Sequence, residues 1–512
     1  MKLKFSLLLC FISCSSFALE IDQNREIEIN NMYEELEYTF DEPFILQNPY
    51  KRNALSALVK FPTKQEAQIE LQVLSKEGKP EITHTFSEYK KEHEIPVLGL
   101  YPNSNNKVLL TAKYKDGTSQ TTTLSIPTKK ADKRALFTIT NKKDEKIKYH
   151  YLHGGIVFDE KGTIRLDFKP EYEMLYFLNG SFVGEDRNKG LIQYNILGKK
   201  EKVYTYPAHF TSFTHGLTQK PNKNFLVIGS FDNQQATVGN QQTQTQREFV
   251  IELDYQTGKM VNKIDLAQLL NPDRSVIIKS DTQNYGLNNW CHINSVDYNS
   301  EDESIVVSCR HVGLVKINEK TKELDFVIAP HKGFEKSGRD GSGPDLSNKL
   351  LTALDKMGDA LPDSVQQGTQ SYPDFKWPTK THDAKTLGDG IYSIFDNSGP
   401  LYDKTMVTSP HSNAQVFKID EKNKTIQSLW FEPLAYHSES GSSVLYNPNE
   451  NEVTVYLSIV KDPYQQGIAT GKLIRYDLTT HEKLFEATLY RGGETYFYGL
   501  MPFSFYQNEG LK

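Results

Sequence analysis

Residues 290–311 read WCHINSVDYNSEDESIVVSCRH, and their pattern is that of a β-hairpin. Over 292–298 and again over 304–311, apolar and polar residues alternate as they do in strands buried on one face. Between these runs, 299–303 are Asn, Ser, Glu, Asp and Glu, a polar stretch that favours a turn. The stretch therefore predicts two antiparallel strands joined by a short loop.

Polar side chains of complementary chemistry meet at the open end of this predicted hairpin. Strand pairing brings His292 and Asn294 close to Arg310. Together they suit an oxyanion such as sulfate or phosphate, because Arg offers planar paired donors and the other two supply neutral ones. Cys291 and Cys309 should also lie roughly opposite each other, at about 4.5–5.5 Å, which a disulfide can bridge. The alternative to an oxyanion site is a chance group of solvated side chains. The alternative to a disulfide is two buried thiols.

Strand-turn-strand units recur on both sides of the hairpin. Most read as an apolar strand, an Asp or Asn, a turn like Lys-Thr-Gly and a second apolar strand, which is typical of the outer hairpins of a β-propeller. The units lie at 155–158 with 164–168, 191–196 with 202–204, 249–254 with 261–265, 313–317 with 325–328, 414–419 with 426–431, and 472–476 with 483–488. They predict a six-bladed β-propeller over residues 133–512.

The region before the propeller has shorter strands. Alternating runs separated by turn residues predict a small β-sandwich, at 56–61, 67–74, 107–114 and 121–126. Residues 24–35 predict a short helix or arm, and the charged stretch 129–133 is a candidate linker. The predicted fold class is all-β, with an N-terminal sandwich domain over 19–132 followed by the propeller.

The first eighteen residues resemble a secretory signal peptide. Lys2 and Lys4 precede an apolar run at 5–14, and small residues at 16–18 suit cleavage. This run is shorter than the about 20 residues that span a bilayer, so we expect a cleaved periplasmic protein without a membrane span. Lipidation at Cys14 is the less favoured alternative. Cleavage would leave two of the four cysteines, and a pair in an oxidising compartment usually forms a disulfide.

Composition excludes one class of partner. The net charge is −6, and no basic stripe or basic terminus is present, so we expect no nucleic-acid binding. The 38% hydrophobic and 11% aromatic content suits a soluble protein with a β-rich core.

Residues 332–371 interrupt the regular spacing of the predicted strands, with a helix expected at 346–357. This insert is predicted to be a lid or a dimer element, with a simple surface excursion as the alternative.

Several motifs together resemble the arylsulfate sulfotransferase family. Its hallmark hairpin reads Trp-x-His-x-Asn-Ser-x-Asp-Tyr and then Ser-x-Arg-His, as residues 290–298 and 308–311 do. Further motifs follow the family order, namely Asn48-Pro49-Tyr50 with 93–102, Phe213-Thr214-His215-Gly216, Trp377-Pro378-Thr379-Lys380-Thr381-His382-Asp383, and Phe395-Asp396-Asn397. The resemblance covers nearly the whole chain and also implies six blades.

The resemblance implies a ping-pong aryl sulfotransferase that uses a sulfohistidine and no nucleotide donor. His382 would be the nucleophile, and His215 would move a proton to and from the phenolic oxygen. His292, Asn294 and Arg310 would hold the sulfuryl oxygens. The expected partners are a phenolic sulfate donor, a phenol acceptor and a second copy in a homodimer. No cofactor is expected, and the chain lacks both a P-loop and a strand-linked Gly-x-Gly-x-x-Gly.

Four other residues and one further partner are also considered. Tyr101 and Tyr498 are candidates for binding the aryl group, although tyrosines are abundant in this chain. By strand alternation, His311 should point away from the site and be structural. His437 is expected to be a loop residue first. Because the best-known family members close their disulfide elsewhere, a periplasmic disulfide-forming oxidase is a candidate partner only.

Two other functions remain open at this point. A metal hydrolase could use His215, His292 and His382 as ligands, but local ligand spacing is absent and Arg310 would repel a cation. A non-catalytic propeller that binds sulfated or aromatic ligands is the main alternative, because propellers host both enzymes and binding modules.

Overall fold

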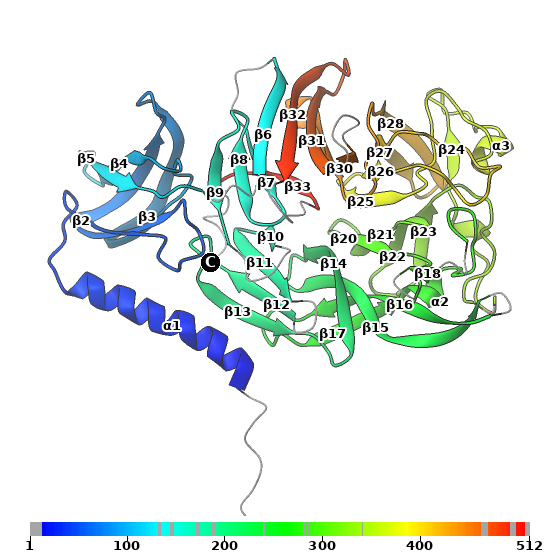
Figure 1. The fold of residues 1–512 in the computed structure, drawn as a ribbon, viewed down its shortest axis with the longest axis horizontal. Helices are drawn as coiled ribbons and strands as arrows, with labels where there is room; N and C mark the ends of the chain where they lie inside the picture. The colour runs from blue at the N-terminus through cyan, green and yellow to red at the C-terminus, as the bar shows by residue number, and fades with distance from the viewer. Residues whose placement is uncertain are drawn as a thin grey trace, which may run out of the picture.

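The computed structural model describes residues 13–131, 135–143, 148–169, 175–186, 190–238, 241–279, 283–284, 287–339, 341–461, 469–491 and 498–506. Most of the predicted signal core and part of the predicted linker 129–133 lie outside these residues. Figure 1 shows a long N-terminal helix, a small β-unit beside it and a ring of sheets that makes up most of the chain. In the described part, no helix is long and apolar enough to cross a membrane.

The N-terminal unit combines one helix with a five-stranded sheet. Helix α1 (Ser13–Glu34) includes the predicted segment 24–35 almost entirely, which confirms the expected helix. The strands follow as β1 (Phe44–Gln47), β2 (Ala57–Leu74), β3 (Pro80–Val97), β4 (Asn105–Tyr114) and β5 (Ser119–Pro127). Strand β2 pairs with β1, β3 and β4, so it is the centre of the sheet.

Two of the predicted strands are parts of one long strand. The runs 56–61 and 67–74 both belong to β2, and the pairing register with β3 shifts between Pro62 and Ala67. Proline cannot donate to a strand ladder, so this local irregularity interrupts the alternation without ending the strand. Strand β3 was missed because its residues 87–94 are mostly polar and exposed.

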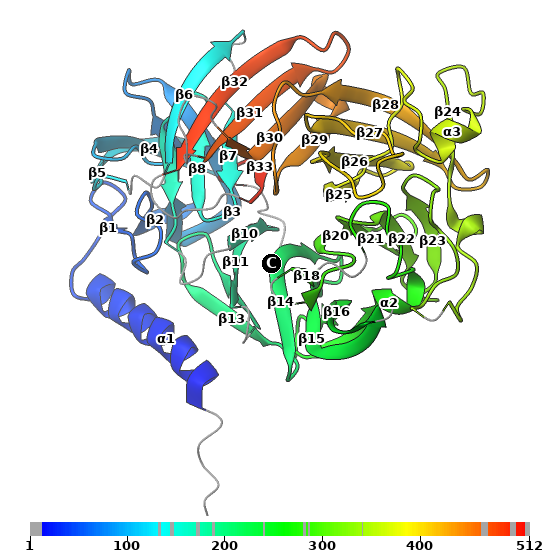
Figure 2. The ribbon, with the colours of Figure 1, turned by 45° about the vertical axis from the view of Figure 1, so that its right-hand side comes forward.

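Six sheets of the described residues form the ring, and the prediction of a six-bladed propeller is confirmed (Figure 2). The first is β33 (Leu500–Phe503), β7 (Tyr149–Leu152), β8 (Ile156–Asp159) and β9 (Ile164–Asp167); the second is β10 (Leu175–Leu178), β11 (Ser181–Asp186), β12 (Gly190–Tyr194) and β13 (Lys200–Thr205). The third is β14 (Phe210–Gln219), β15 (Phe225–Val238), β16 (Gln241–Leu253) and β17 (Met260–Asp265), extended by the short strands β18 (Gln283–Asn284) and β19 (Leu287–Asn288).

The other three blades follow the same order. The fourth is β20 (Ile293–Asn299), β21 (Ser304–Cys309), β22 (Gly313–Asn318) and β23 (Leu324–Ile328). The fifth is β25 (Thr381–Thr386), β26 (Ile391–Asp396), β27 (Asn413–Asp420) and β28 (Thr425–Pro433), with β24 (Thr352–Leu354) outside β28. The sixth is β29 (Ser443–Asn447), β30 (Glu452–Lys461), β31 (Ala469–Asp477) and β32 (Lys483–Arg491). The predicted units are the last two main strands of each blade.

The ring is closed from both ends of the chain. The C-terminal strand β33 completes the first blade, and β6 (Ala135–Lys142) pairs with β32 at the outer edge of the last. Fully buried Arg475 donates to both oxygens of Glu160, at 2.9 and 3.1 Å, and to Glu452 at 2.8 Å. His150 contacts Glu160 at 3.0 Å. This cluster joins the last blade to the first.

The predicted helix within the insert 332–371 is wrong. Residues 346–357 form only the 3₁₀ turn η1 (Ser347–Lys349) and β24, and a short helix α3 (Asp363–Gln366) follows. Buried Leu351 and Ala353 pack into the core shared by the fourth and fifth blades, and β24 pairs with β28 in parallel. This pairing at the open sheet edge outweighs local helix propensity. Residues 352–354 therefore extend the outer edge of a blade.

Candidate active site

Most of the predicted site residues gather at one face of the propeller. His292 immediately precedes β20 and His382 lies at the start of β25, while Arg310 follows the end of β21. Because β20 and β21 are antiparallel, the start of one and the end of the other lie at the same edge. We call this the histidine face. The turns after β14, β20 and β25 lie at the opposite edge, which we call the turn face.

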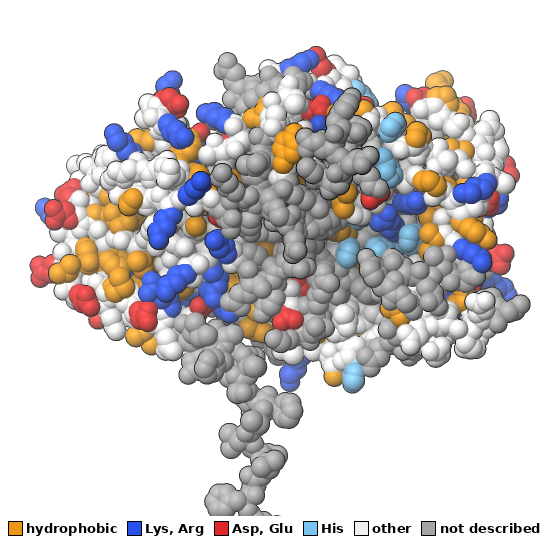
Figure 3. Space-filling model, in the orientation of Figure 1, with side chains coloured by type: hydrophobic (Ala, Val, Ile, Leu, Met, Phe, Trp, Pro, Cys, Tyr) orange, Lys and Arg blue, Asp and Glu red, His pale blue; other side chains and the backbone are white. Residues whose placement is uncertain are grey.

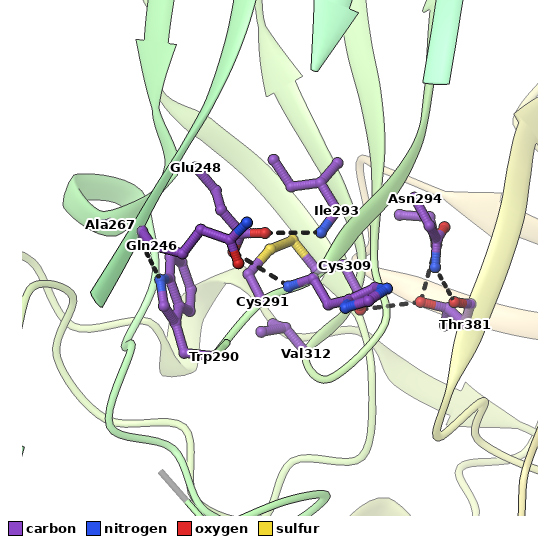
Figure 4. Close-up of a disulfide and its surroundings, with 12 residues drawn as sticks. Gln246, Glu248, Ala267, Trp290, Cys291, Ile293, Asn294, Cys309, Val312 and Thr381 are labelled. Carbon is purple, nitrogen blue, oxygen red and sulfur yellow. Dashed lines mark hydrogen bonds between the residues drawn. A yellow bond between two sulfur atoms is a disulfide. The ribbon is translucent and has the colours of Figure 1, made fainter. Parts of the chain in front are cut away.

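The hairpin forms in the predicted register. Ile293 pairs with Cys309, and a bulge near Asn294 shifts the next pair to Ser295 and Ser308. Beyond the strands, the N–H of Arg310 donates to the carbonyl of His292 at 3.1 Å. Cys291 and Cys309 form a disulfide with Cα atoms 4.9 Å apart, which confirms the predicted bond (Figure 4).

A buried carboxylate fixes the backbone that carries His292. His292 adopts a left-handed backbone conformation, with φ of 55°. Glu248, fully buried on β16, accepts the backbone N–H groups of His292 at 3.1 Å and Ile293 at 3.0 Å. Burial raises the pKa of Glu248 to about 7, although these hydrogen bonds oppose the rise. Figure 4 shows this carboxylate beside the disulfide.

Glu248 was missed in the sequence, although a signal was present. It shares a strand face with Val250, which is buried in the core, so alternation along β16 marks it as an inward-facing charge. Such a group needs partners in the interior.

His382 is held by both ring nitrogens. Its ring is buried, with 2% of the residue exposed. Nδ1 lies 3.3 Å from the carbonyl oxygen of Ser442, and Nε2 lies 2.5 Å from the hydroxyl of Tyr498. A carbonyl can only accept, so the proton of His382 is on Nδ1. The hydroxyl of Tyr498 lies much closer to Nε2 than to the Asn294 carbonyl, which is 3.3 Å away, so the Nε2 lone pair accepts its proton. Burial, followed by the charges of Arg310 and the neighbouring histidines, holds the pKa of His382 well below its usual value, and the ring is neutral.

The other two candidate histidines lie beside this pair. His215, from β14, has its ring 4.9 Å from the ring of Tyr498 and 5.8 Å from that of His292. The amide of Asn289 contacts His292 Nδ1 at 2.7 Å. Because the amide nitrogen donates, the proton of His292 is on Nε2. Burial lowers the pKa of His292 to about 3, helped by His215 and Arg310, so this ring is neutral as well.

Asn294 connects the hairpin to the strand of His382. It is fully buried, and its Nδ2 donates to the carbonyl of Thr381 at 2.6 Å. The hydroxyl of Thr381 in turn donates to the carbonyl of Cys309 at 3.0 Å and accepts from Ser308 at 3.0 Å. Among the described residues, Asn294 Oδ1 has no hydrogen-bond partner. These contacts tie the blade of His292 to the blade of His382.

The expectation that His311 points away from the site is wrong. Its ring lies 5.6 Å from that of His292 rather than on the opposite side of the sheet. Strand β21 ends at Cys309, and the N–H of Val312 donates back to the Cys309 carbonyl at 3.0 Å. Alternation does not continue through this turn. His311 is therefore part of the histidine face.

Tyr101 is the one predicted site residue that lies elsewhere. Its hydroxyl donates to Glu81 at 2.6 Å, and its ring stacks under the guanidinium of Arg165 at 3.9 Å. Arg165 also donates to the carbonyl of Gly99 at 2.7 Å. Tyr101 thus belongs to the contact between the N-terminal sheet and the first blade, whereas Tyr498 lies against His382.

The remaining side chains of the site are half-buried or polar. Arg310 is half-buried, and its Nη2 donates to the backbone carbonyl of Glu439 at 2.6 Å. His437 lies in the loop between β28 and β29, as expected. No group of three or more His, Cys, Asp or Glu side chains placed to hold a metal ion occurs in the described ranges. The site therefore offers the neutral imidazole of His382, neutral donors and one guanidinium.

Comparison with known proteins gives two family matches. The family described as Arylsulfotransferase (ASST) matches residues 121–498, and the Arylsulfotransferase Ig-like domain matches residues 44–129. The second match agrees with the predicted β-sandwich.

Similar proteins are distant. "Arylsulfate sulfotransferase AssT" of Escherichia coli O6:H1 is 27% identical over 334 residues, which cover 57% of this chain and 52% of that protein. The protein of the same description from Lelliottia amnigena is 26% identical over 269 residues, 46% of this chain and 43% of its own. The chain thus spans about half the length of the curated relatives it matches. Among solved structures, the β-propeller domain of Cps50 (Swd1) from Myceliophteria thermophila has a TM-score of 0.33 at 8% identity, covering 70% of this chain and all of that one.

Proposed function

Because this chain belongs to the arylsulfotransferase family, we propose that it moves a sulfuryl group from a phenolic sulfate ester to a phenol through His382. The main support for this function is the burial and the protonation state of the His382 ring. The ring is buried and neutral, with Nδ1–H directed at the Ser442 carbonyl and the Nε2 lone pair directed at Tyr498. That nitrogen is a nucleophile at neutral pH without further activation.

In the first step, Nε2 of His382 attacks the sulfur of the donor and the bond from sulfur to the aryl oxygen breaks. The departing phenolate has a conjugate-acid pKa of about 10, so protonation assists its release. We assign this proton transfer to His215, whose ring lies against Tyr498. The sulfuryl group is then bonded to Nε2, and the Ser442 carbonyl stabilises the positive charge through Nδ1–H.

In the second step, the oxygen of the acceptor phenol attacks the same sulfur. The bond between Nε2 and sulfur breaks, and His215 takes the phenol proton. Charge on the sulfuryl oxygens would be held by Nε2–H of His292 and the guanidinium of Arg310, since preorganised donors are the main source of catalysis in such transfers. Asn294 would act through Thr381, by fixing the distance between the blades of His292 and His382.

Tyr498 has to move in this mechanism. Its hydroxyl occupies the space in front of Nε2 at 2.5 Å, which the sulfur must enter. Its ring lies beside His215, so that after the hydroxyl is displaced it would contact the aryl group, as expected for a substrate-binding tyrosine.

Compartment and domain limits form part of the same proposal. The disulfide in the structure is consistent with an oxidising compartment. We propose that residues 1–18 are a cleaved signal and that a sandwich domain over 19–132 and a propeller over 133–512 act in the periplasm.

The test follows 4-nitrophenol release from 4-nitrophenyl sulfate with and without added phenol, together with intact-mass analysis. We expect release that rises with phenol and one sulfuryl adduct on His382. The variant His382→Asn should lose both, while His481→Asn, an exposed histidine of the last blade, serves as the control. Release independent of phenol would identify a hydrolase. No release, no adduct and retained ligand affinity in His382→Asn would establish a binding module instead.

A further inference from the structure

A second group of basic side chains lies beside the proposed sulfuryl site. Figure 3 shows histidine, lysine and arginine side chains gathered on one area of the propeller face, over β20 and β25. Lys380 is two residues before His382, and its carbonyl accepts from the N–H of Asn397 at 3.0 Å. Lys380 therefore lies at the same edge of the fifth blade as His382.

The side chains of Lys380 and His437 meet over Gly399, which is buried. A Cβ atom on Gly399 would stand 3.3 Å from Cε1 of His437 and 3.5 Å from Nζ of Lys380. Gly399 has φ of 103°, a conformation that side-chain-bearing residues rarely adopt. The absence of a side chain at Gly399 thus lets the two basic side chains lie close to each other.

No carboxylate of the described residues neutralises Lys380. Its Nζ donates to the carbonyl of Pro400 at 2.9 Å, which leaves two of its three N–H groups for other acceptors. Nδ1 of His437 is buried and has no hydrogen-bond partner among the described residues. Both side chains therefore have hydrogen-bonding capacity for a ligand.

The charges around Lys380 and His437 are mostly positive. Arg310 reaches the loop of His437 by donating to the carbonyl of Glu439, and its charge acts on both Lys380 and His437. The acids that face the group are Glu439, which is exposed, and Asp396. Asp396 is already bound by the backbone N–H groups of 379, 380 and 398 and by Asn413, and Lys376 lies 3.5 Å from it.

We propose that Lys380 and His437, which meet over Gly399, form a subsite for a second acidic group on the aryl substrate. The proposal rests on the proposed function, because the subsite adjoins the histidines assigned to sulfuryl transfer. Arg310 lies between the two, with its backbone bonded to His292 and its guanidinium bonded to the loop of His437. The substrate class is thus a phenol, or its sulfate ester, whose ring carries a short carboxylate-bearing chain.

The experiment compares two acceptors that differ in one charge, 3-(4-hydroxyphenyl)propionate and 3-(4-hydroxyphenyl)propionamide, with 4-nitrophenyl sulfate as donor. We expect the wild type to favour the acid in kcat/KM by about tenfold or more, since hydrogen bonds to charged groups are the stronger class. Lys380→Met should abolish this ratio and Lys380→Arg should retain it. The control Lys418→Met removes a cation whose Nζ donates to the carbonyl of Asp389 on the turn face, and should keep the ratio.

Calorimetric binding of the same two compounds gives a readout that does not depend on turnover. Binding of the acid should weaken about tenfold in Lys380→Met and stay unchanged in Lys418→Met, with thermal melting used to confirm folding. Equal kcat/KM and equal affinity for acid and amide in the wild type would overturn the subsite. Absence of any sulfation, with the charge-dependent binding intact, would overturn the proposed function and leave the subsite standing.

Discussion

Replacing Glu248 with Gln tests whether a buried carboxylate positions His292. In the wild type, the two carboxylate oxygens accept one backbone N–H each, from His292 and Ile293, with no solvent to substitute for them. Glutamine keeps one acceptor but directs an NH₂ group at the other N–H. One buried donor then loses its partner.

The expected loss of stability follows from this single lost hydrogen-bond partner. Leaving a buried donor unsatisfied costs about 1–3 kcal/mol. We expect Glu248→Gln to lower the free energy of unfolding by this amount. The lost hydrogen bond also destabilises the left-handed backbone that positions His292. We therefore expect kcat to fall about tenfold, which corresponds to about 1.4 kcal/mol in the activation free energy.

The assay combines urea unfolding with phenol-dependent release of 4-nitrophenol. Glu252→Gln is the matched control, because Glu252 lies on the same face of β16 and accepts from Lys220 and Asn224, away from His292. The control should lose stability and keep its kcat. Native kcat in Glu248→Gln, or an equal loss of kcat in Glu252→Gln, would refute the positioning role.

Glu248 also predicts a pH dependence of stability. Its folded pKa of about 7 lies above the unfolded value of about 4.3. Between these values the native state keeps a proton that the unfolded state releases, so this contribution to stability is complete below about pH 4.3 and is lost as pH rises to about 7. In Glu248→Gln, stability should lack this decline across the window, as measured by urea unfolding at several pH values.

Three further outcomes are expected. The double variant Cys291→Ala/Cys309→Ala should be about 3 kcal/mol less stable in urea unfolding, because the disulfide closes a loop with a sequence separation of 18; a loss below 1 kcal/mol would contradict this. Arg475→Met should cost about 3–5 kcal/mol, because it leaves Glu160 buried without its main cationic partner; thermal melting checks this, and an unchanged melting point would show that the ring closes without the cluster. Burial lowers the pKa of His150, so its contribution to stability should be lost as pH falls below about 6.5, and His150→Asn should remove that part of the acid destabilisation.

The local sequence pattern was sufficient to predict the strands that repeat from blade to blade. The outer hairpins of the blades carry alternation and turn residues within single short segments, so each was visible without knowledge of its neighbours. The hairpin of 290–311 and its disulfide were predicted for the same reason, since antiparallel pairing alone determines which residues are opposite.

Local pattern failed where tertiary contacts compete with it. Residues 346–357 read as helical, but the open edge of β28 offers backbone pairing that an isolated segment lacks. His311 follows a strand that ends one residue before Arg310, and alternation along the sequence does not show that turn. Tyr101 was a candidate only through its aromatic ring, and the sequence did not reveal that Arg165 and Glu81 enclose it.

By itself, the sequence determined the all-β class, the number of blades and the disulfide, because each depends on residue type and short-range spacing. The set of candidate histidines came from the resemblance of its motifs to the arylsulfate sulfotransferase family. Only the tertiary structure decided which atoms meet: Nε2 of His382 with Tyr498, Nδ1 with the Ser442 carbonyl, and Glu248 with the backbone of His292. These contacts join separate blades. Their geometry depends on how the blades close into a ring, and no local pattern along the chain encodes that closure.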